Sequence, residues 1–206
     1  MRNLIRLLVL LLVISHPMDL WAKGSKEKES SKEKAVFAGG CFWCMEPEFE
    51  NIPGVLRVTS GYTGGNLKNP RYQDVLSGST GHVESIEVTY DPKRVSYPKL
   101  LEVFWENVDP LDPDGQFCDK GAQYRAGIFY YSDDQKVQAE QSLADVVKKL
   151  RQPVTAFIRQ GSEFYPAEDY HQEYSIKNKE RYKLYRDGCG RDARLKKIRM
   201  IMNEQP

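Results

Sequence analysis

Two cysteines separated by two aromatic residues, in the order Cys41-Phe42-Trp43-Cys44, are the residues of this chain best suited to covalent chemistry. Two glycines precede them and end a short apolar run, residues 35–38, which we expect to be a strand, and the interleaved glutamates and apolar residues that follow favour a helix. Cys41 would then lie at a helix N-terminus, where backbone N–H groups and the helix dipole stabilise a thiolate. A lone cysteine is usually a small core residue, but this setting favours a reactive thiol.

A carboxylic acid occurs on the apolar face of the clearest predicted strand, residues 83–90. Side chains two positions apart share one face of a strand, so Glu84 lies with Ile86 and Val88, whereas Glu87 lies on the polar face. Loss of hydration on the inward face raises the pKa of a carboxyl group, which could then act as a general acid near neutral pH. The alternative is that Glu84, at the start of the strand, reaches past the rim of the sheet into water.

Two tyrosines and an aspartate are further candidates for the same site. Tyr72 lies in a long irregular segment, residues 66–81, and Tyr124 begins the next predicted strand, shortly after Asp119. Phenolic hydroxyl groups donate hydrogen bonds without adding charge, which suits a site where an oxygen develops negative charge. Because the chain has 12 tyrosines, most of them are packing or surface residues, and these two gain weight only in combination with Glu84.

The elements that must position these residues alternate between strands and helices. Besides the strands already given, we expect strands at residues 55–60, 124–131 and 154–158. One helix is expected to begin near Ser96 and a second near Ser132, and a third helical region is expected over residues 168–186. Residues 61–65 and 109–121 are predicted to be loops. This order predicts an α/β (α+β) fold: a two-layer sandwich of a mixed central β-sheet with packed helices, long functional loops and an irregular C-terminal tail.

The first 34 residues have the composition of a targeting segment and a linker. Arg2 and Arg6 accompany an apolar run at residues 7–15 that is short for a membrane span. We therefore interpret residues 1–22 as a signal peptide, or as an N-terminal membrane anchor if it is not cleaved. Residues 23–34 are rich in Lys, Glu and Ser and are predicted to be a disordered charged linker. The expected location is outside the cytoplasm, periplasmic or secreted.

The remaining chain is predicted to contain one catalytic domain, residues 35–190, followed by a basic tail, residues 191–206. We interpret the basic stretch from Arg191 to Arg199 as a solvated terminal helix. The net charge of +1 gives no reason to expect a nucleic-acid partner. The four cysteines are too few for a disulfide scaffold. The three histidines do not share the spacing of zinc ligands with them, so neither a metal nor a cofactor is expected.

Seven short motifs follow one another along the chain: GCFWCME at 40–46, GYTGG at 61–65, NPRY at 69–72, GHVE at 81–84, FWEN at 104–107, DKGAQYR at 119–125 and AEDYHQ at 167–172. Taken in order, they resemble the motifs of A-type peptide-methionine sulfoxide reductases. The resemblance covers the whole predicted domain and ends near Cys189, and so many motifs in the same order make an accidental match implausible.

The resemblance implies a reaction and a role for each residue that matches the family pattern. Cys41 would attack the sulfoxide sulfur of methionine-S-sulfoxide, while Glu84, Tyr72 and Tyr124 would hydrogen-bond the sulfoxide oxygen and help to protonate it. It further implies that Asp119 orders water and neighbouring hydrogen bonds. The aromatic pair Phe42 and Trp43 would receive the S-methyl group of the substrate.

The resemblance also implies a redox cycle that repairs oxidised proteins. Cys41 would become a sulfenic acid, a second thiol would condense with it, and thioredoxin or an exported thioredoxin-like dithiol would reduce the disulfide. Cys189, flanked by glycines and near several arginines, is the first candidate for the resolving thiol. Cys44 is the alternative, since many family members have glycine there, and Cys118 is a third candidate.

Two other classes of function are compatible with the cysteines. Cys41 and Cys44 could belong to a thiol–disulfide exchange enzyme, although the aromatic-rich remainder of the chain does not read as a thioredoxin-like unit. Alternatively, the chain could be a binding or structural protein whose thiols only close a disulfide after export. Turnover of a sulfoxide distinguishes the first prediction from both.

Overall fold

A computed structural model describes residues 32–203 of the chain. The predicted signal peptide, residues 1–22, and nearly all of the predicted linker, residues 23–34, lie outside the described residues. The linker ends earlier than expected, because strand β1 begins at Glu33 rather than at Ala35. Within the described part of the chain, no helix is both long and apolar enough to cross a membrane.

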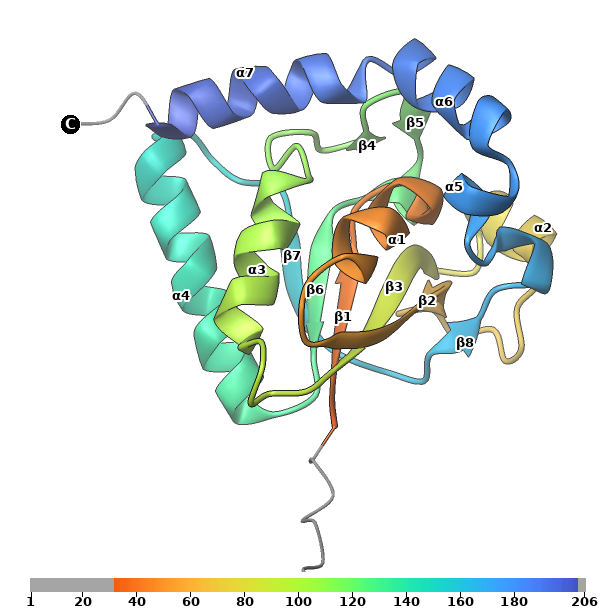
Figure 1. Cartoon of the computed structure of the whole chain (residues 1–206), viewed down its shortest axis with the longest axis horizontal. Helices are drawn as coiled ribbons and strands as arrows, with labels where there is room; N and C mark the ends of the chain where they lie inside the picture. Colours follow the sequence, from red (N-terminus) through yellow and green to blue (C-terminus); the bar gives the residue numbers. More distant parts are fainter. Residues whose placement is uncertain (1–31, 204–206) are drawn as a thin grey trace, which may run out of the picture.

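A six-stranded mixed sheet forms the centre of the fold, with the strand order β7-β6-β1-β3-β2-β8 (Figure 1). All neighbours are antiparallel except β6 and β7, which are parallel. The strands are β1 Glu33–Ala38, β2 Val55–Thr63, β3 Val83–Tyr90, β6 Gly127–Tyr130, β7 Phe157–Gln160 and β8 Tyr165–Pro166.

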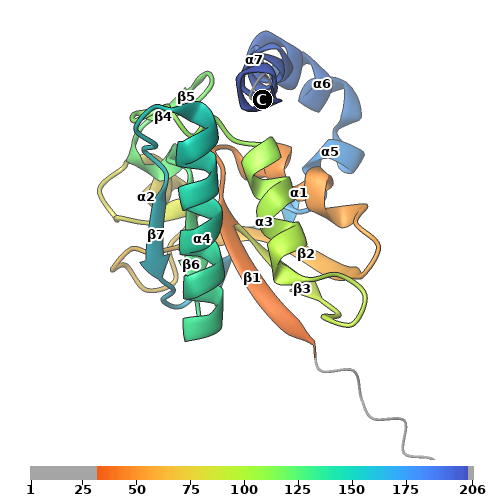
Figure 2. The same ribbon diagram turned by 90° about the vertical axis from the view of Figure 1, so that its left-hand side faces the viewer.

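Three of the helices, α1, α3 and α4, cover one face of this sheet (Figures 1 and 2). A two-stranded hairpin, β4 and β5, lies beside the N-terminus of α1, and the mixed sheet with packed helices confirms the predicted fold class. The helices are α1 Phe42–Glu50, α2 Tyr72–Leu76, α3 Tyr97–Glu106, α4 Asp133–Leu150, α5 Tyr174–Lys177, α6 Lys179–Gly188 and α7 Arg191–Asn203; the hairpin is β4 Gly115–Gln116 with β5 Asp119–Lys120, and 3-10 turns cover Ala122–Tyr124 and Asp169–His171.

Alternation along the central strands separates the two faces of the sheet. In β1, Ala35 and Phe37 belong to the main core under the helices, whereas Val36 and Ala38 belong to a smaller cluster with Phe129 on the opposite face. The same period of two places every second residue of β3 under the helices. The face that receives α1 is therefore fixed by the strand sequences.

Both predicted helix caps are confirmed. Ser96 accepts a hydrogen bond from the backbone N–H of Lys99 at the start of α3, and Ser132 accepts one from Gln135 at the start of α4. Each hydroxyl satisfies a backbone donor that has no partner within the helix.

Several predicted boundaries differ from the structure because strand pairing extends or shortens the elements. Residues 61–63 of the predicted glycine loop continue β2, since they pair with β3. Gly61 is required there by close approach, because a Cβ atom would lie 2.4 Å from the carbonyl oxygen of Tyr165 in the neighbouring β8. Conversely, Tyr124 lies in a 3-10 turn rather than in a strand.

Further boundaries shift in the irregular and C-terminal parts of the chain. The predicted loop at residues 66–81 contains the short helix α2, and β7 begins at Phe157 rather than at residue 154. The single helical region expected over residues 168–186 is divided into a 3-10 turn, α5 and α6.

The helix predicted in the basic tail is confirmed: residues 191–203 form α7, which crosses the end of α4 (Figure 1). The tail is therefore not irregular over these residues, and it is not fully solvated. Leu195 and Ile198 are buried, and so is Arg191, which is only 2% exposed. The Arg191 guanidinium donates to the carbonyl oxygen of Asn107 at 2.5 Å and lies over the ring of Phe117. Burial of this arginine is tolerated because backbone oxygens accept from it.

Candidate active site

Cys41 is the N-cap residue of α1, at the edge where β1 turns into the helix. The turn depends on Gly40, whose φ is +81° and where a Cβ atom would lie 2.6 Å from the Cβ of Gln116. Cys41 is 6% exposed and Cys44, one turn further along the helix, is 2% exposed. Both cysteines are free, and their side chains hydrogen-bond one another.

Glu84 lies on the helix-covered face of β3, directly under the start of α1. It is 3% exposed, and its Oε2 accepts a hydrogen bond from the backbone N–H of Phe42 at 3.1 Å. The pKa of Glu84 is raised to about 8, mainly by burial. The negative charges of Asp119 and Cys44 contribute to this increase, and the hydrogen bond from Phe42 opposes it. The inward orientation predicted from the strand pattern is therefore confirmed, and the alternative that this side chain reaches water is wrong.

The two thiols of α1 differ in acidity. Burial raises the pKa of Cys41 well above its ordinary value, with additional contributions from the hydrogen bond to Cys44 and the charge of Glu84. The hydrogen bond from Cys41 lowers the pKa of Cys44, assisted by Arg191 and Arg186. The sequence predicted a readily ionised Cys41, and this is wrong for the unliganded protein because desolvation outweighs the helix N-terminus.

Tyr72 and Tyr124 converge on the same place from different elements, Tyr72 from the first residue of α2 and Tyr124 from the 3-10 turn before β6. Their side chains hydrogen-bond one another. Burial raises the pKa of Tyr72 to about 12 and also raises that of Tyr124, and the charges of Glu84 and Cys41 act on both in the same direction. Both phenols therefore stay protonated, as hydrogen-bond donors beside the acid and the thiol.

The aromatic pair differs in access. Phe42 is 1% exposed, whereas Trp43 is half-buried, and its indole stacks on the ring of Tyr174 at a centroid distance of 3.7 Å. The Trp43 Nε1–H donates to Nδ1 of His171 at 3.0 Å. Burial lowers the pKa of His171 to about 4, so the ring is neutral and can accept this bond. His171 therefore has a structural role: it holds the tryptophan in place.

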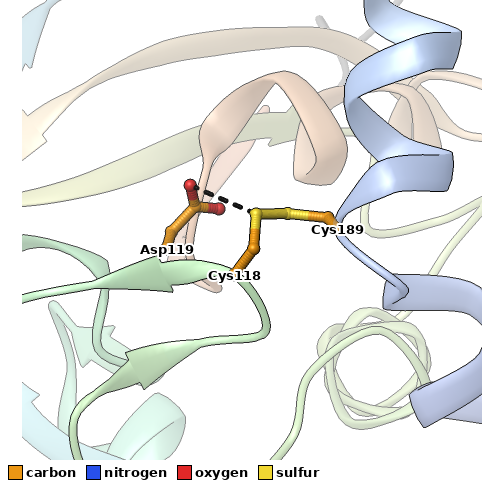
Figure 3. A group of neighbouring side chains, drawn as sticks. All are labelled: Cys118, Asp119 and Cys189. Atoms are coloured by element: carbon orange, nitrogen blue, oxygen red, sulfur yellow. Dashed lines mark hydrogen bonds between the residues drawn. A yellow bond between two sulfur atoms is a disulfide. The ribbon is translucent and has the colours of Figure 1, made fainter.

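Asp119 lies between the thiols and a second sulfur pair. Its Oδ2 accepts a hydrogen bond from the hydroxyl group of Tyr185 at 2.5 Å, and the same hydroxyl group also hydrogen-bonds Cys41. Its Oδ1 lies 3.8 Å from the Sγ of Cys118 (Figure 3). Sequence reasoning missed Tyr185; the only indication was its position one helical turn before Cys189.

The second sulfur pair is a disulfide between Cys118 and Cys189, whose Cα atoms are 4.9 Å apart (Figure 3). Cys118 lies in the turn of the β4–β5 hairpin and Cys189 lies between α6 and α7. Cys189 was predicted to be the thiol that resolves Cys41, and here its partner is Cys118. In the described part of the chain, these sulfurs and Asp119 are also the one group spaced for metal ligation, but the disulfide occupies both sulfurs.

A surface hollow of about 650 Å³ lies elsewhere, lined by acidic residues of α1 and by residues near α5. Neither Cys41 nor Glu84 lines it. The candidate site is therefore defined by converging side chains rather than by this hollow: Cys41, Cys44, Glu84, Tyr72, Tyr124, Asp119, Trp43 and Tyr185.

Comparison with known proteins gives matches over most of the chain. A family model described as peptide methionine sulfoxide reductase matches residues 33–201, which include most of α7. The peptide methionine sulfoxide reductase MsrA 2 of Caulobacter vibrioides is 51% identical over 167 residues, which are 81% of this chain and 85% of that protein. The corresponding MsrA of Bacillus licheniformis is 48% identical over 164 residues, 79% of this chain and 91% of that protein.

Two solved structures have a similar fold. The methionine sulfoxide reductase A of Corynebacterium diphtheriae superimposes with a TM-score of 0.70 at 32% identity, over 74% of this chain and 77% of that one. Mxr1 of Saccharomyces cerevisiae in its reduced form gives a TM-score of 0.69 at 29% identity, over 72% of this chain and 86% of that one.

Proposed function

The chain belongs to the peptide methionine sulfoxide reductase family, and from this premise we propose that it reduces methionine-S-sulfoxide, free or in oxidised proteins, to methionine. The observation that carries the proposal is the buried, protonated carboxyl group of Glu84 beneath the thiol of Cys41. A sulfoxide oxygen is a poor leaving group until it is protonated, so the reaction needs an acid opposite the attacking sulfur.

Glu84 suits the role of acid and Cys41 that of nucleophile, because a negative charge on one of them disfavours a negative charge on the other. The charge of Glu84 raises the pKa of Cys41, so the neutral acid and the ionised thiol are the compatible pair. The Cys41 thiolate attacks the sulfoxide sulfur while Glu84 transfers its proton toward the oxygen. This attack forms a bond between the two sulfurs. The protonated oxygen is then transferred to the Cys41 sulfur as the substrate S–O bond and the new S–S bond break, so methionine leaves and Cys41 carries the OH group as a sulfenic acid.

The remaining residues orient the substrate. Tyr72 and Tyr124 donate hydrogen bonds to the sulfoxide oxygen, and Asp119 orders the hydrogen bonds around the sulfur through Tyr185. The exposed part of Trp43, together with Phe42 beneath it, receives the S-methyl group. The site thus fixes the positions of the methyl group, of the oxygen and of the attacking thiol around the sulfoxide sulfur. In the other epimer two of the groups on this sulfur exchange places, so only one epimer fits.

The cycle is completed by thiols. A second cysteine condenses with the sulfenic acid and releases water, and an external dithiol of the thioredoxin class then reduces the resulting disulfide. Cys189, Cys44 and Cys118 are the candidates for the resolving cysteine. The exposed position of Cys118 and the half-buried position of Cys189 support reduction by a protein dithiol at that surface.

We further propose that the enzyme works outside the cytoplasm, where an exported thioredoxin-like protein would supply the electrons. The support is the composition of residues 1–22, with two arginines and an apolar run. Fractionation of cells that produce the full chain tests this: activity in the periplasm or the medium is expected, and activity only in the cytosol would contradict it.

The proposed activity is tested with separate S and R epimers of a methionine sulfoxide and dithiothreitol. We expect turnover of the S epimer alone and none from the Cys41→Ser variant. Failure to reduce either epimer, combined with reduction of insulin disulfides, would instead identify a thiol–disulfide exchange enzyme. Equal turnover by Cys41→Ser would remove the thiol from the mechanism.

A further inference from the structure

We infer that the acidic hollow beside α5 binds the side chain of a lysine or arginine that lies a few positions from the oxidised methionine in a substrate protein. The hollow has a volume of about 650 Å³ and lies between the second half of α1, the start of β2 and residues 169–176. The inference rests on the proposed reductase function and concerns which oxidised methionines the enzyme prefers.

Glu46 supplies the buried part of the negative charge. Its side chain lines the hollow, yet the residue is only 1% exposed, and neither carboxylate oxygen has a hydrogen-bond partner of normal geometry. Burial raises the pKa of Glu46 to about 7, although the backbone N–H groups of Glu173 and Tyr174 act in the opposite direction. Because a buried carboxylate without a full set of partners is costly, a cation that enters the hollow meets an acceptor that is not yet satisfied.

Two further carboxylates, on Glu50 and Glu173, add to this charge. Both raise the pKa of Glu46, and the pKa of Glu50 is raised by burial and by the charge of Glu173. Lys177 pairs with Glu173 at 3.1 Å, and the exposed Arg57 also lines the hollow. In the described residues neither of these cations forms an ion pair with Glu46 or Glu50, so the carboxylates of the hollow repel one another and favour a further cation.

An organic cation fits the hollow better than a metal ion does. Within the part of the chain that the structure describes, these carboxylates do not form a group with the spacing of metal ligands. Leu56 and Ile176, which also line the hollow, are 47% and 68% exposed and offer apolar surface at its rim. Lysine and arginine combine an apolar stem with a charged head, so the stem can pack on the rim while the head reaches the carboxylates.

The hollow lies along the same face of α1 as the tryptophan of the active site. Trp43, Glu46 and Glu50 are three and four positions apart, so they share one side of the helix, with Glu46 about 4.5 Å and Glu50 about 10.5 Å further along its axis than Trp43. Tyr174 of α5 stacks on Trp43, and α5 also borders the hollow. An extended peptide advances about 3.4 Å per residue, so a side chain roughly two to four positions from a methionine held on Trp43 reaches the hollow.

The test compares peptides that differ in the charge of one side chain. Each peptide carries one methionine-S-sulfoxide among glycines, with either lysine or acetyl-lysine three positions before or after it, and the full chain reduces it with dithiothreitol at pH 8 and low salt. We expect kcat/KM to be about 5-fold higher for the lysine peptide on at least one side. The gain is expected in KM, because the ionic contact is made equally in the ground state and the transition state, and it is expected to shrink at about 0.5 M salt.

A double variant, Glu46→Gln/Glu50→Gln, tests whether the hollow is the source of this preference. It is expected to lose most of the preference for lysine, whereas Glu87→Gln, on the other face of the sheet where Glu87 pairs with Lys34, is expected to keep it. Reduction of the acetyl-lysine peptide by the double variant shows that it is folded; if it is not, Glu50→Gln alone is compared and is expected to show a smaller preference than wild type.

Two results would overturn the inference: equal kcat/KM of the wild type for the lysine and acetyl-lysine peptides on both sides, or an undiminished preference in the folded variant. A wild type that reduces none of the peptides would instead refute the reductase function itself.

Discussion

Replacing Glu84 by glutamine removes the proposed acid while keeping its shape and an oxygen that accepts from the Phe42 N–H. With a pKa of about 8, roughly 90% of Glu84 is protonated at pH 7, whereas an ordinary glutamate would be below ~1%. Loss of a positioned general acid lowers the rate by about 10²–10⁴-fold, or about 3–5 kcal/mol in the activation free energy. We expect a decrease of this size in kcat/KM for Glu84→Gln.

The pH dependence gives a second, independent readout of the same group. Because burial raises the pKa of Glu84 to about 8, its acidic proton is present below that pH and is lost as the pH rises through it. Ionisation of Cys41, whose pKa is raised well above its ordinary value, acts in the opposite direction. We therefore expect the wild-type kcat/KM to rise with pH and to level off near pH 8, whereas in the Glu84→Gln variant it keeps rising through pH 8.

The assay measures reduction of the S epimer from pH 6 to 9, with Glu87→Gln as the matched control. Glu87 lies on the same strand but on the opposite face, where it pairs with Lys34 at 2.9 Å, so its replacement is expected to leave kcat/KM unchanged. Wild-type rates for Glu84→Gln across this pH range would refute the general-acid role.

Three further changes test other parts of the structure. Tyr124→Phe removes a hydrogen-bond donor to the sulfoxide oxygen and is expected to lower kcat/KM by roughly 10-fold or more; an unchanged value would remove it from the site. Burial raises the pKa of Glu46 to about 7, so the folded state loses stability as the pH rises from 4.5 to 7 and this carboxyl group ionises. Glu46→Gln is therefore expected to have a higher melting temperature than wild type at pH 8 but not at pH 4; equal melting temperatures at pH 8 would contradict this. Ser132→Ala removes the α4 cap and is expected to destabilise by about 1 kcal/mol in denaturant unfolding, with unchanged turnover; no loss of stability would contradict the capping role.

Local patterns in the sequence were sufficient for the parts of the fold that depend on local physics. The period of two in β3 placed Glu84 on the covered face, and Ser96 and Ser132 identified the starts of two helices. These features depend on residues within one or two turns or strand positions of each other. The strand–helix alternation likewise predicted the mixed sheet with helices on it.

The remaining features depend on contacts between distant segments, which no local pattern encodes. The disulfide joins cysteines 71 positions apart, and the burial of Arg191 depends on a carbonyl group 84 positions away. A low pKa of Cys41 was predicted from its position at the helix N-terminus alone. In the structure, burial and the charge of Glu84 raise this pKa instead. Tyr185 belongs to the site only because the folded chain brings α6 next to the start of α1, where its ring contacts Trp43.

The most direct test of the central claim is a crystal structure of the Cys41→Ser variant with a bound peptide that contains methionine-S-sulfoxide. We expect the sulfoxide oxygen within hydrogen-bond distance of Glu84 and of a tyrosine hydroxyl, with the sulfur facing Oγ of the new serine and the methyl group on Trp43. A sulfoxide bound away from Glu84, for example in the acidic hollow beside α5, would contradict the account.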